Sequence, residues 1–231
     1  MKTAKVLTEE LTTANLADAC LRLGIAPRCA VLRGVTTGVR LSGRCLPVRH
    51  YGSVDIFLEA ISSAGSGDVL IVDNAGRTDE GCVGDLVVLE AAAAGLSGIV
   101  IWGCHRDTAE IRALGLPIFS LGANAAGPVR LDPRSELAFV SAAVSDFSVT
   151  RADFAVADDD GVLFLPADQL DNLIRAGCSI RETEQRQARL APKGVTLRSQ
   201  LRFQEYLERR KSDSSLTFRK HLQSLGGSIE E

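Results

Sequence analysis

Residues 67–121 carry the most regular pattern of the chain and read GDVLIVDNAGRTDEGCVGDLVVLEAAAAGLSGIVIWGCHRDTAEIRALGLPIFSL. Three short apolar runs in this stretch have the composition of strands that are buried on both faces. They lie at residues 67–73, 98–102 and 117–121. Segments of helical pattern separate them, at residues 85–94 and 107–114. This order predicts a parallel βαβαβ core, because a parallel strand must be reached by a crossover.

The segment before this core predicts a helix near the N-terminus. Residues 8–23 have helical periodicity, with either Thr12 or Thr13 as the N-cap and Gly24 after the end. Apolar residues share one face of this helix.

Strands, a second helix and two loops are expected between that helix and the end of the core. Residues 30–50 are rich in Val, Leu and Thr and predict two short strands. Residues 53–64 predict a helix, whose candidate core positions are Ile56, Leu58, Ala60 and Ile61. A glycine-rich loop is expected over residues 74–84, and a tight loop over residues 103–107.

After Pro128 the pattern changes to antiparallel strands followed by helices. Strand-like segments lie at residues 129–131, 138–144 and 154–164, the last with a turn at its Asp-Asp-Asp-Gly sequence. A long helix is expected from about residue 166 to 190. The polar, helix-prone tail suggests a division into a domain at residues 1–195 and a helical extension at residues 196–231.

The composition is that of an ordinary globular protein. The chain has 231 residues, 45% of them hydrophobic and 24% charged, which excludes wholesale disorder. Its formal net charge is -3, so the chain has no excess of positive charge that would attract nucleic acid or an anionic membrane. We therefore expect neither as a partner. No apolar leader is visible, and the six Cys have no metal-site spacing, so we expect a cytoplasmic protein with reduced thiols.

The distribution of lysine narrows the chemistry further. Lysine occurs at positions 2, 5, 193, 211 and 220, so the segment from residue 6 to residue 192 contains none. The central segment therefore has no Schiff-base lysine for a lysine-dependent aldolase or a pyridoxal phosphate enzyme. It also has no lysine for a phosphate-binding loop of the Walker type.

Two loops of the predicted core carry charged and glycine residues that suit a small anion. Gly84 precedes one predicted helix, and Arg106 precedes the next. Both positions follow strands of a parallel sheet, so they lie at the sheet edge where α/β proteins bind ligands. The free amides after Gly84 suit a carboxylate or a phosphate, and Arg106 suits the same anion. The carboxylates of Asp85 and Asp107 suit magnesium or manganese.

A purely structural role is open for the same residues. Asp107 followed by Glu110 is typical of a capping box, and Asp85 is a plausible N-cap. Arg106 alone is typical of a surface charge. The case for a site rests on the two loops being neighbours.

At these residues the chain resembles the class II pyruvate aldolases, whose signature is an aspartate, twenty residues, and then Arg-Asp. Here Asp85 and Arg106-Asp107 match it, within the flanking segments GDVLIVD, VGDL, GIVIWGCHRD, LGLPIF and ADDDGVLFLP. The family acts on 4-hydroxy-4-methyl-2-oxoglutarate and includes RraA, a regulator of ribonuclease E, and chains often mislabelled as demethylmenaquinone methyltransferase. The resemblance covers about residues 10–190. The chain departs from it at His105, where a small or apolar residue is expected.

The resemblance implies a role for each matching residue. The pyruvyl carboxylate would be held by the backbone amides of Gly84, Asp85, Leu86 and Val87. Arg106 would bind the substrate and stabilise the enolate. Asp107 would hold Mg²⁺ (or Mn²⁺ or Co²⁺), mostly through water, and Asp85 would orient a metal-bound water for proton transfer.

The resemblance also implies the fold and the assembly. The fold would be a single-domain layered α/β sandwich of the swivelling-domain type, with the parallel βαβαβ core and a helical C-terminal tail. Its chains would form trimers or hexamers with active sites between subunits. The glutamate that such a neighbour contributes would be Glu182 or Glu184 here.

These implications define one leading function and two alternatives. The leading function is a divalent-metal-dependent lyase that releases pyruvate from 4-hydroxy-2-oxo acids and decarboxylates oxaloacetate. The alternative from another class is a non-catalytic regulator of ribonuclease activity that acts by protein binding, with the Arg- and Lys-rich tail as the candidate contact. A methyltransferase is disfavoured, because no glycine-rich S-adenosylmethionine loop follows the first strand.

Overall fold

The computed structural model describes residue 7 and residues 10–225. Its largest sheet has the strand order β1-β11-β10-β3-β4-β5-β6-β2, and β7 pairs with β5 beside that path. Along the chain these strands are β1 (Arg28–Ala30), β2 (Arg33–Gly34), β3 (Leu41–Arg49), β4 (Val69–Val83), β5 (Gly98–His105), β6 (Ile118–Ser120), β7 (Gly122–Ala123), β10 (Asp153–Asp158) and β11 (Gly161–Pro166). A separate hairpin joins β8 (Ser141–Val144) to β9 (Phe147–Thr150).

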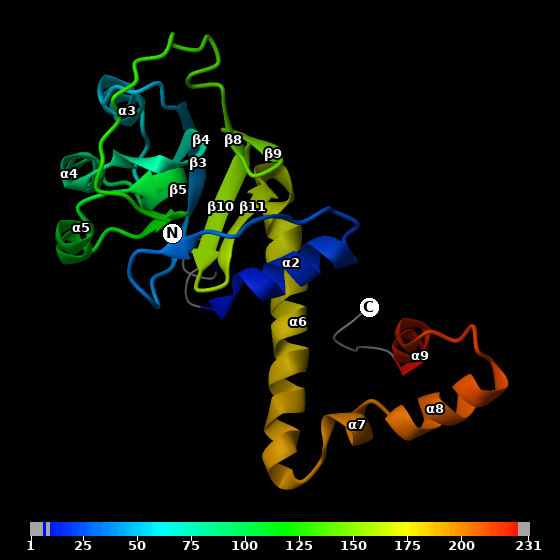
Figure 1. The fold of residues 1–231 in the computed structure, drawn as a ribbon. Coiled ribbons are helices and arrows are strands. Elements are labelled where there is room, and N and C mark those ends of the chain that lie inside the picture. The colour runs from blue at the N-terminus through cyan, green and yellow to red at the C-terminus, as the bar shows by residue number, and fades with distance from the viewer. Residues whose placement is uncertain (1–6, 8–9, 226–231) are drawn as a thin grey trace.

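The predicted parallel core is confirmed. Strands β3, β4, β5 and β6 are neighbours and run parallel. The crossovers between them are the helices α3 (Asp55–Ser62), α4 (Asp85–Ala93) and α5 (Thr108–Leu114). All three helices cover the same face of the parallel strands (Figure 1). The fold is therefore a layered α/β structure, as predicted.

Alternate residues of the parallel strands enter different hydrophobic clusters. Leu70 and Val72 of β4 pack in the cluster beneath the three crossover helices. Val69 and Ile71 pack in the cluster formed with β8, β9, β10 and β11 on the other face. Side chains of a strand alternate between faces, so a strand that is covered on both sides must be apolar throughout. This is why the core strands read as continuous apolar runs.

Two further helices cover the antiparallel part of the sheet. They are α2 (Thr13–Arg22) and α6 (Leu170–Leu190), which pack together over β10 and β11 (Figure 1). Thr12 is the N-cap of α2, and its side chain forms a capping box with Asn15. A short 3₁₀ turn (Ala167–Gln169) precedes α6, so the long helix begins a few residues later than predicted.

Three expectations between residues 50 and 131 are wrong. The residues expected as loops at 74–84 and 103–105 mostly belong to β4 and β5, which continue as an irregular ladder with register shifts. Leu58 is 47% exposed, and Phe57 takes the core position, since α3 begins at Asp55 and turns that face inward. Residues 129–131 form no strand; Val129 is 98% exposed there.

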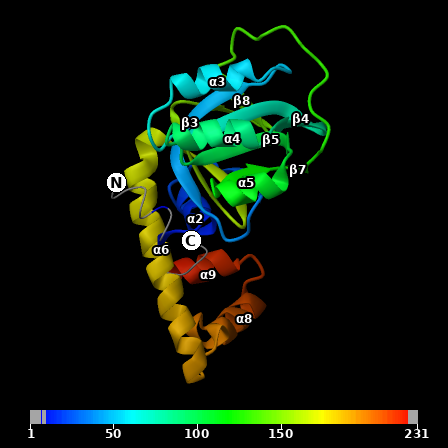
Figure 2. The same ribbon diagram turned by 90° about the vertical axis from the view of Figure 1, so that its left-hand side faces the viewer.

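The C-terminal helices form a small cluster of their own. They are α7 (Leu197–Gln200), α8 (Phe203–Ser212) and α9 (Phe218–Leu225), after a 3₁₀ turn at Ala191–Lys193. The rings of Phe203, Tyr206, Phe218 and His221 pack against one another, mostly tilted or edge to face. Figure 1 and Figure 2 show that α8 and α9, which carry these rings, lie below the sheet. Within the described ranges, no helix is both long enough and apolar enough to cross a membrane.

Candidate functional site

Sheet pairing brings the two predicted loops together. Val83 at the end of β4 lies opposite His105 at the end of β5. The backbone N–H of Arg106 donates to the carbonyl of Val83 at 2.9 Å. The chain leaves both strands at the same point, so Gly84 and Arg106 are neighbours, as the sequence predicts.

Asp107 occupies the position between these loops in an unusual conformation. Its backbone is left-handed, with φ of 58°, and its side chain forms no cap on α5. Its Oδ2 instead lies 3.4 Å from both Nε of Arg106 and the backbone nitrogen of Asp85. A Cβ at position 84 would collide with this oxygen, so the approach depends on Gly84. The capping explanation for Asp107 is therefore wrong.

Backbone amides at the start of α4 form the other wall. Gly84 is the N-cap and Asp85 is the first helical residue, so Asp85 is no N-cap either. The Leu86 amide donates to Oδ1 of Asp85 at 2.8 Å, while the Val87 amide has no acceptor within the described part of the chain. The positive end of the helix dipole therefore faces the cavity with a free donor.

These groups line one cavity of about 370 Å³. That volume fits a small metabolite rather than a cofactor of nucleotide size. Its lining residues are His50, Gly52, Val54, Gly81, Cys82, Gly84, Asp85, Leu86, Val87, Arg106, Gly127 and Pro128. Arg106 extends along it, and a Cβ at Gly127 would lie 2.6 Å from Nη1 of Arg106, so that glycine makes room for the guanidinium.

The oxygen donors at this cavity fit a divalent cation that keeps most of its water. Asp107 is 37% exposed at the side chain, and Asp85 is its neighbour across the loops. No group of three or more potential ligands occurs among the residues described. Magnesium is usually held by one or two carboxylates together with water and substrate, so a small carboxylate set is suitable for it.

The predicted glutamates lie elsewhere in the chain. Glu182 is exposed on α6, which packs on α2 on the other side of the sheet from α4 and α5 (Figure 1). Glu184 accepts a hydrogen bond at 2.7 Å from Asn15 of α2. Neither lines the cavity of this chain, so a catalytic role would need a second copy.

His50, which the sequence analysis missed, follows β3 and lines the cavity. The residue is only 8% exposed, and its ring stacks on Phe57 at a centroid distance of 5.0 Å. Burial lowers the pKa of His50 below its ordinary value of 6.5, so the imidazole is neutral at pH 7. Its place at the ligand-binding edge of the sheet follows from the parallel pairing of β3 with β4, which the sequence pattern does not show.

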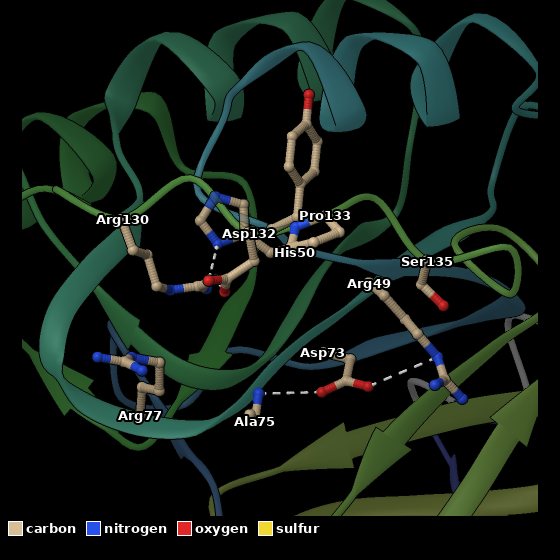
Figure 3. Close-up of a pocket in the computed structure, with 10 residues that line it drawn as sticks. Arg49, His50, Asp73, Ala75, Arg77, Arg130, Asp132, Pro133 and Ser135 are labelled. Atoms are coloured by element: carbon tan, nitrogen blue, oxygen red, sulfur yellow. Dashed lines mark hydrogen bonds and ion pairs between the residues drawn. The ribbon is translucent and has the colours of Figure 1, made fainter.

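A polar network lies behind His50 and lines a second cavity of about 250 Å³ (Figure 3). Its centre is Arg130, which donates from Nη2 to Oδ1 of Asn74 at 2.7 Å and to Oε1 of Glu80 at 3.0 Å. Nδ1 of His50 lies 2.9 Å from the same Asn74 oxygen. Asn74 and Glu80 are 1% and 4% exposed. The network therefore fixes one edge of the His50 ring.

The histidine and cysteine next to Arg106 have structural surroundings. His105 is buried, and its two ring nitrogens lie within 3.0 Å of the hydroxyls of Ser120 and Thr108. Cys104 is also buried, and burial raises the pKa of its thiol above 9.0. Neither residue lines the cavity.

Comparison with known proteins finds relatives of this chain. A curated relative named putative 4-hydroxy-4-methyl-2-oxoglutarate aldolase, from Deinococcus radiodurans, is 29% identical over 70% of this chain and 99% of its own length. Protein DlpA of Legionella pneumophila is 28% identical over 80% of this chain, but the match spans only 31% of that longer protein.

Solved structures match the same part of the chain. Streptomyces coelicolor RraAS2, described as an unusual member of the RNase ES inhibitor RraA family, has a TM-score of 0.69, 25% identity and coverage of 80% and 94% of the two chains. The RNA-processing inhibitor RraA from Thermus thermophilus has a TM-score of 0.59, 27% identity and coverage of 68% and 93%. The family model described as "RraA-like: Aldolase/RraA" matches residues 13–164, which is more than half of the chain. The protein therefore belongs to the RraA-like aldolase family.

Proposed function

We propose that this protein is a divalent-metal-dependent lyase that cleaves 4-hydroxy-2-oxo acids, of the 4-hydroxy-4-methyl-2-oxoglutarate type, to pyruvate. One observation carries the proposal: the start of α4 and Arg106 line a single cavity, and the Asp107 carboxylate lies directly beside them, 3.4 Å from Nε of Arg106. An anion receptor, a cation at the developing oxyanion and a metal-binding carboxylate are the three elements that this chemistry needs.

The substrate's carboxylate binds at the start of α4. The free Val87 amide and the helix dipole attract its negative charge. Arg106, 46% exposed at its side chain, reaches the same anion from the neighbouring loop. This places the 2-oxo group between Arg106 and Asp107.

Mg²⁺ (with Mn²⁺ or Co²⁺ as substitutes) would be held by Asp107, with Asp85 beside it, and when bound it supplies a Lewis acid for the 2-oxo group. As the C3–C4 bond breaks, Arg106 stabilises the negative charge that develops on the 2-oxo oxygen. Asp85, next to the α4 amides, orients a water that delivers the proton to C3 of the pyruvate enolate. Oxaloacetate decarboxylation forms the same enolate, so the same site performs both reactions.

A homo-oligomer, either a trimer or a hexamer, would complete the site. Leu86 and Val54 at the cavity are 75% and 53% exposed, which is costly for apolar side chains unless another surface covers them. A neighbouring copy would cover them and bring Glu182 of its α6 to the cavity.

The test is pyruvate release coupled to lactate dehydrogenase, with oxaloacetate and with 4-hydroxy-4-methyl-2-oxoglutarate, in Mg²⁺ or Mn²⁺ and then in excess chelator. We expect turnover of both substrates that chelator abolishes. No turnover with any metal would contradict the lyase and would favour the non-catalytic alternative, in which the chain binds a ribonuclease as the names of its RraA relatives suggest.

A further inference from the structure

The cleavage reaction needs a proton acceptor that oxaloacetate decarboxylation does not need. In a 4-hydroxy-2-oxo acid the C4 hydroxyl must lose its proton before C3–C4 can break. In oxaloacetate the breaking bond leads to a carboxylate, which is already deprotonated. The group that accepts the C4 proton is therefore specific to the cleavage of hydroxy acids.

Few groups that line the cavity could accept this proton. Among its described lining residues, only His50, Cys82, Asp85 and Arg106 carry ionisable side chains. Arg106 is permanently protonated. Burial raises the pKa of the Cys82 thiol to about 12, so it also stays protonated. Asp85 lies with the α4 amides at the carboxylate end of the cavity, which leaves His50 as the group that this chain itself supplies at the other end.

The hydrogen bonds behind His50 determine which nitrogen is the acceptor. Arg130 can only donate, and its Nη2 lies 2.7 Å from Asn74, so the Asn74 atom there must be the oxygen. That oxygen lies 2.9 Å from Nδ1 of His50 and can only accept. Nδ1 must therefore carry the ring proton, because a bare Nδ1 would place two lone pairs against each other. The contact between Nδ1 and Arg130 at 3.3 Å is then a close approach of two donors rather than a hydrogen bond.

This tautomer leaves the lone pair on Nε2. In imidazole the two nitrogens point in nearly opposite directions, and Figure 3 shows one nitrogen of His50 against Arg130 and the other directed away from it. Within residues 7 and 10–225, the polar contacts of the ring are those of Nδ1. The His50 side chain lines the cavity and is 1% exposed, so its Nε2 acceptor is open only to a ligand that occupies the cavity.

We infer that Nε2 of His50 is the proton acceptor for the C4 hydroxyl of the substrate, an inference that rests on the proposed lyase activity. The O–H proton moves to Nε2, and the electron pair of that bond forms the new C4=O. The C3–C4 pair becomes the C2=C3 bond of the enolate, whose negative charge lies on the 2-oxo oxygen. The proton leaves the imidazolium after the carbonyl product departs, so the cycle has no net redox change.

Charged groups around the ring support this role. Glu80 of β4 approaches Nδ1 at 3.9 Å, and Asp132 and Arg130 lie on the following loop. Burial nevertheless has the largest effect and lowers the pKa of His50, so the base form predominates at neutral pH. Glu80 counteracts that effect and stabilises the imidazolium that forms on proton transfer.

The test compares two substitutions in two reactions of the full-length protein. His50→Asn keeps an amide donor near the position of Nδ1 and removes Nε2. His50→Gln places a non-basic amide near the position of Nε2. In both variants we expect cleavage of 4-hydroxy-4-methyl-2-oxoglutarate to fall by about 100-fold or more in kcat, the range of general-base catalysis. Oxaloacetate decarboxylation should stay within about threefold, because it uses the remaining site only.

A pH profile separates catalysis from mere structural support. The rate of cleavage by the wild-type protein should fall as the pH decreases through the pKa of His50. The rate of decarboxylation should show no such decrease. Equal losses in both reactions, or no loss in either, would refute the assignment to His50 while leaving the lyase intact. Wild-type protein that decarboxylates oxaloacetate but cleaves no hydroxy acid would also refute it, and wild-type protein that does neither would refute the lyase itself.

Discussion

The two halves of the candidate cavity are built differently. The loop half, which consists of residues 84–87 with Arg106 and Asp107, is partly exposed; the side chains of Arg106 and Asp107 are 46% and 37% exposed. The strand half, in which Asn74, Glu80 and Arg130 lie behind the cavity-lining His50, is mostly buried, with Asn74 only 1% exposed. A group that captures a ligand from water must be accessible, whereas a group whose tautomer matters must be held rigidly. Substitutions in the loop half should therefore lower activity with little loss of stability. Substitutions behind His50 should lower stability, and His50 itself should affect the cleavage of hydroxy acids.

The largest effect is expected from Arg106→Ala. Loss of the cation at the developing oxyanion should lower kcat/KM for both substrates by about 100- to 1000-fold. The half-exposed side chain pairs only loosely with Asp107, at 3.4 Å, so the midpoint of urea unfolding should hardly change. The control is Arg134→Ala, since Arg134 is 40% exposed and lines neither cavity. Near-normal turnover of the Arg106 variant under saturating metal would show that Arg106 has no catalytic role.

A stability effect should dominate in the strand half. Glu80→Ala removes the buried carboxylate that pairs with Arg130 and leaves the arginine with Asn74 and the more exposed Asp132, so it should reduce the free energy of unfolding by about 3 kcal/mol. Glu59→Ala is the matched control, because Glu59 pairs with Arg134 at 52% side-chain exposure and its loss should change stability by less than about 1 kcal/mol. Urea unfolding measures both. Equal stabilities of the two variants would show that the buried network does not hold this half together.

Gly84→Ala should weaken metal use without unfolding the protein. Gly84 has φ of -116°, which any residue adopts, so the added Cβ strains no backbone but displaces the Asp107 carboxylate. We expect the Mg²⁺ concentration for half-maximal activity to rise by about 10-fold or more. Gly65→Ala is the control, because its Cβ would meet nothing closer than 3.4 Å. An unchanged Mg²⁺ dependence would exclude Asp107 as the metal-binding carboxylate.

The smallest expected effect is a loss of stability in mild acid. The folded protein holds the pKa of His50 below 6.5, so the unfolded chain binds the proton first as the pH falls through 6.5. The contribution of His50 to stability is therefore complete above that pH and is lost as the pH falls towards the lowered folded value. Urea unfolding at pH 7.0 and at about pH 5.5 should show a smaller decrease for His50→Asn than for wild type. Identical decreases would mean that His50 titrates normally.

Sequence alone determined the parts of this protein that depend on local pattern. The apolar runs and the helices at residues 85–94 and 107–114 predicted the parallel core, because buried strands and amphipathic helices have characteristic periods. The core's topology then placed Gly84 beside Arg106, since parallel strands end at one edge. Tertiary structure overruled the local pattern at residues 74–83, where pairing with β5 extends β4 through a segment that reads as a loop.

Only the tertiary structure decided which distant residues complete the cavity. His50 comes from the end of a strand whose direction the sequence pattern does not show, and its tautomer depends on Arg130, which lies 80 residues away. Gly127 makes room for the Arg106 guanidinium through a contact that no local spacing indicates. Local sequence encodes secondary structure and its caps, but contacts between separate elements depend on how the whole sheet packs. The sequence could therefore predict the loop half of the cavity and could not predict the strand half.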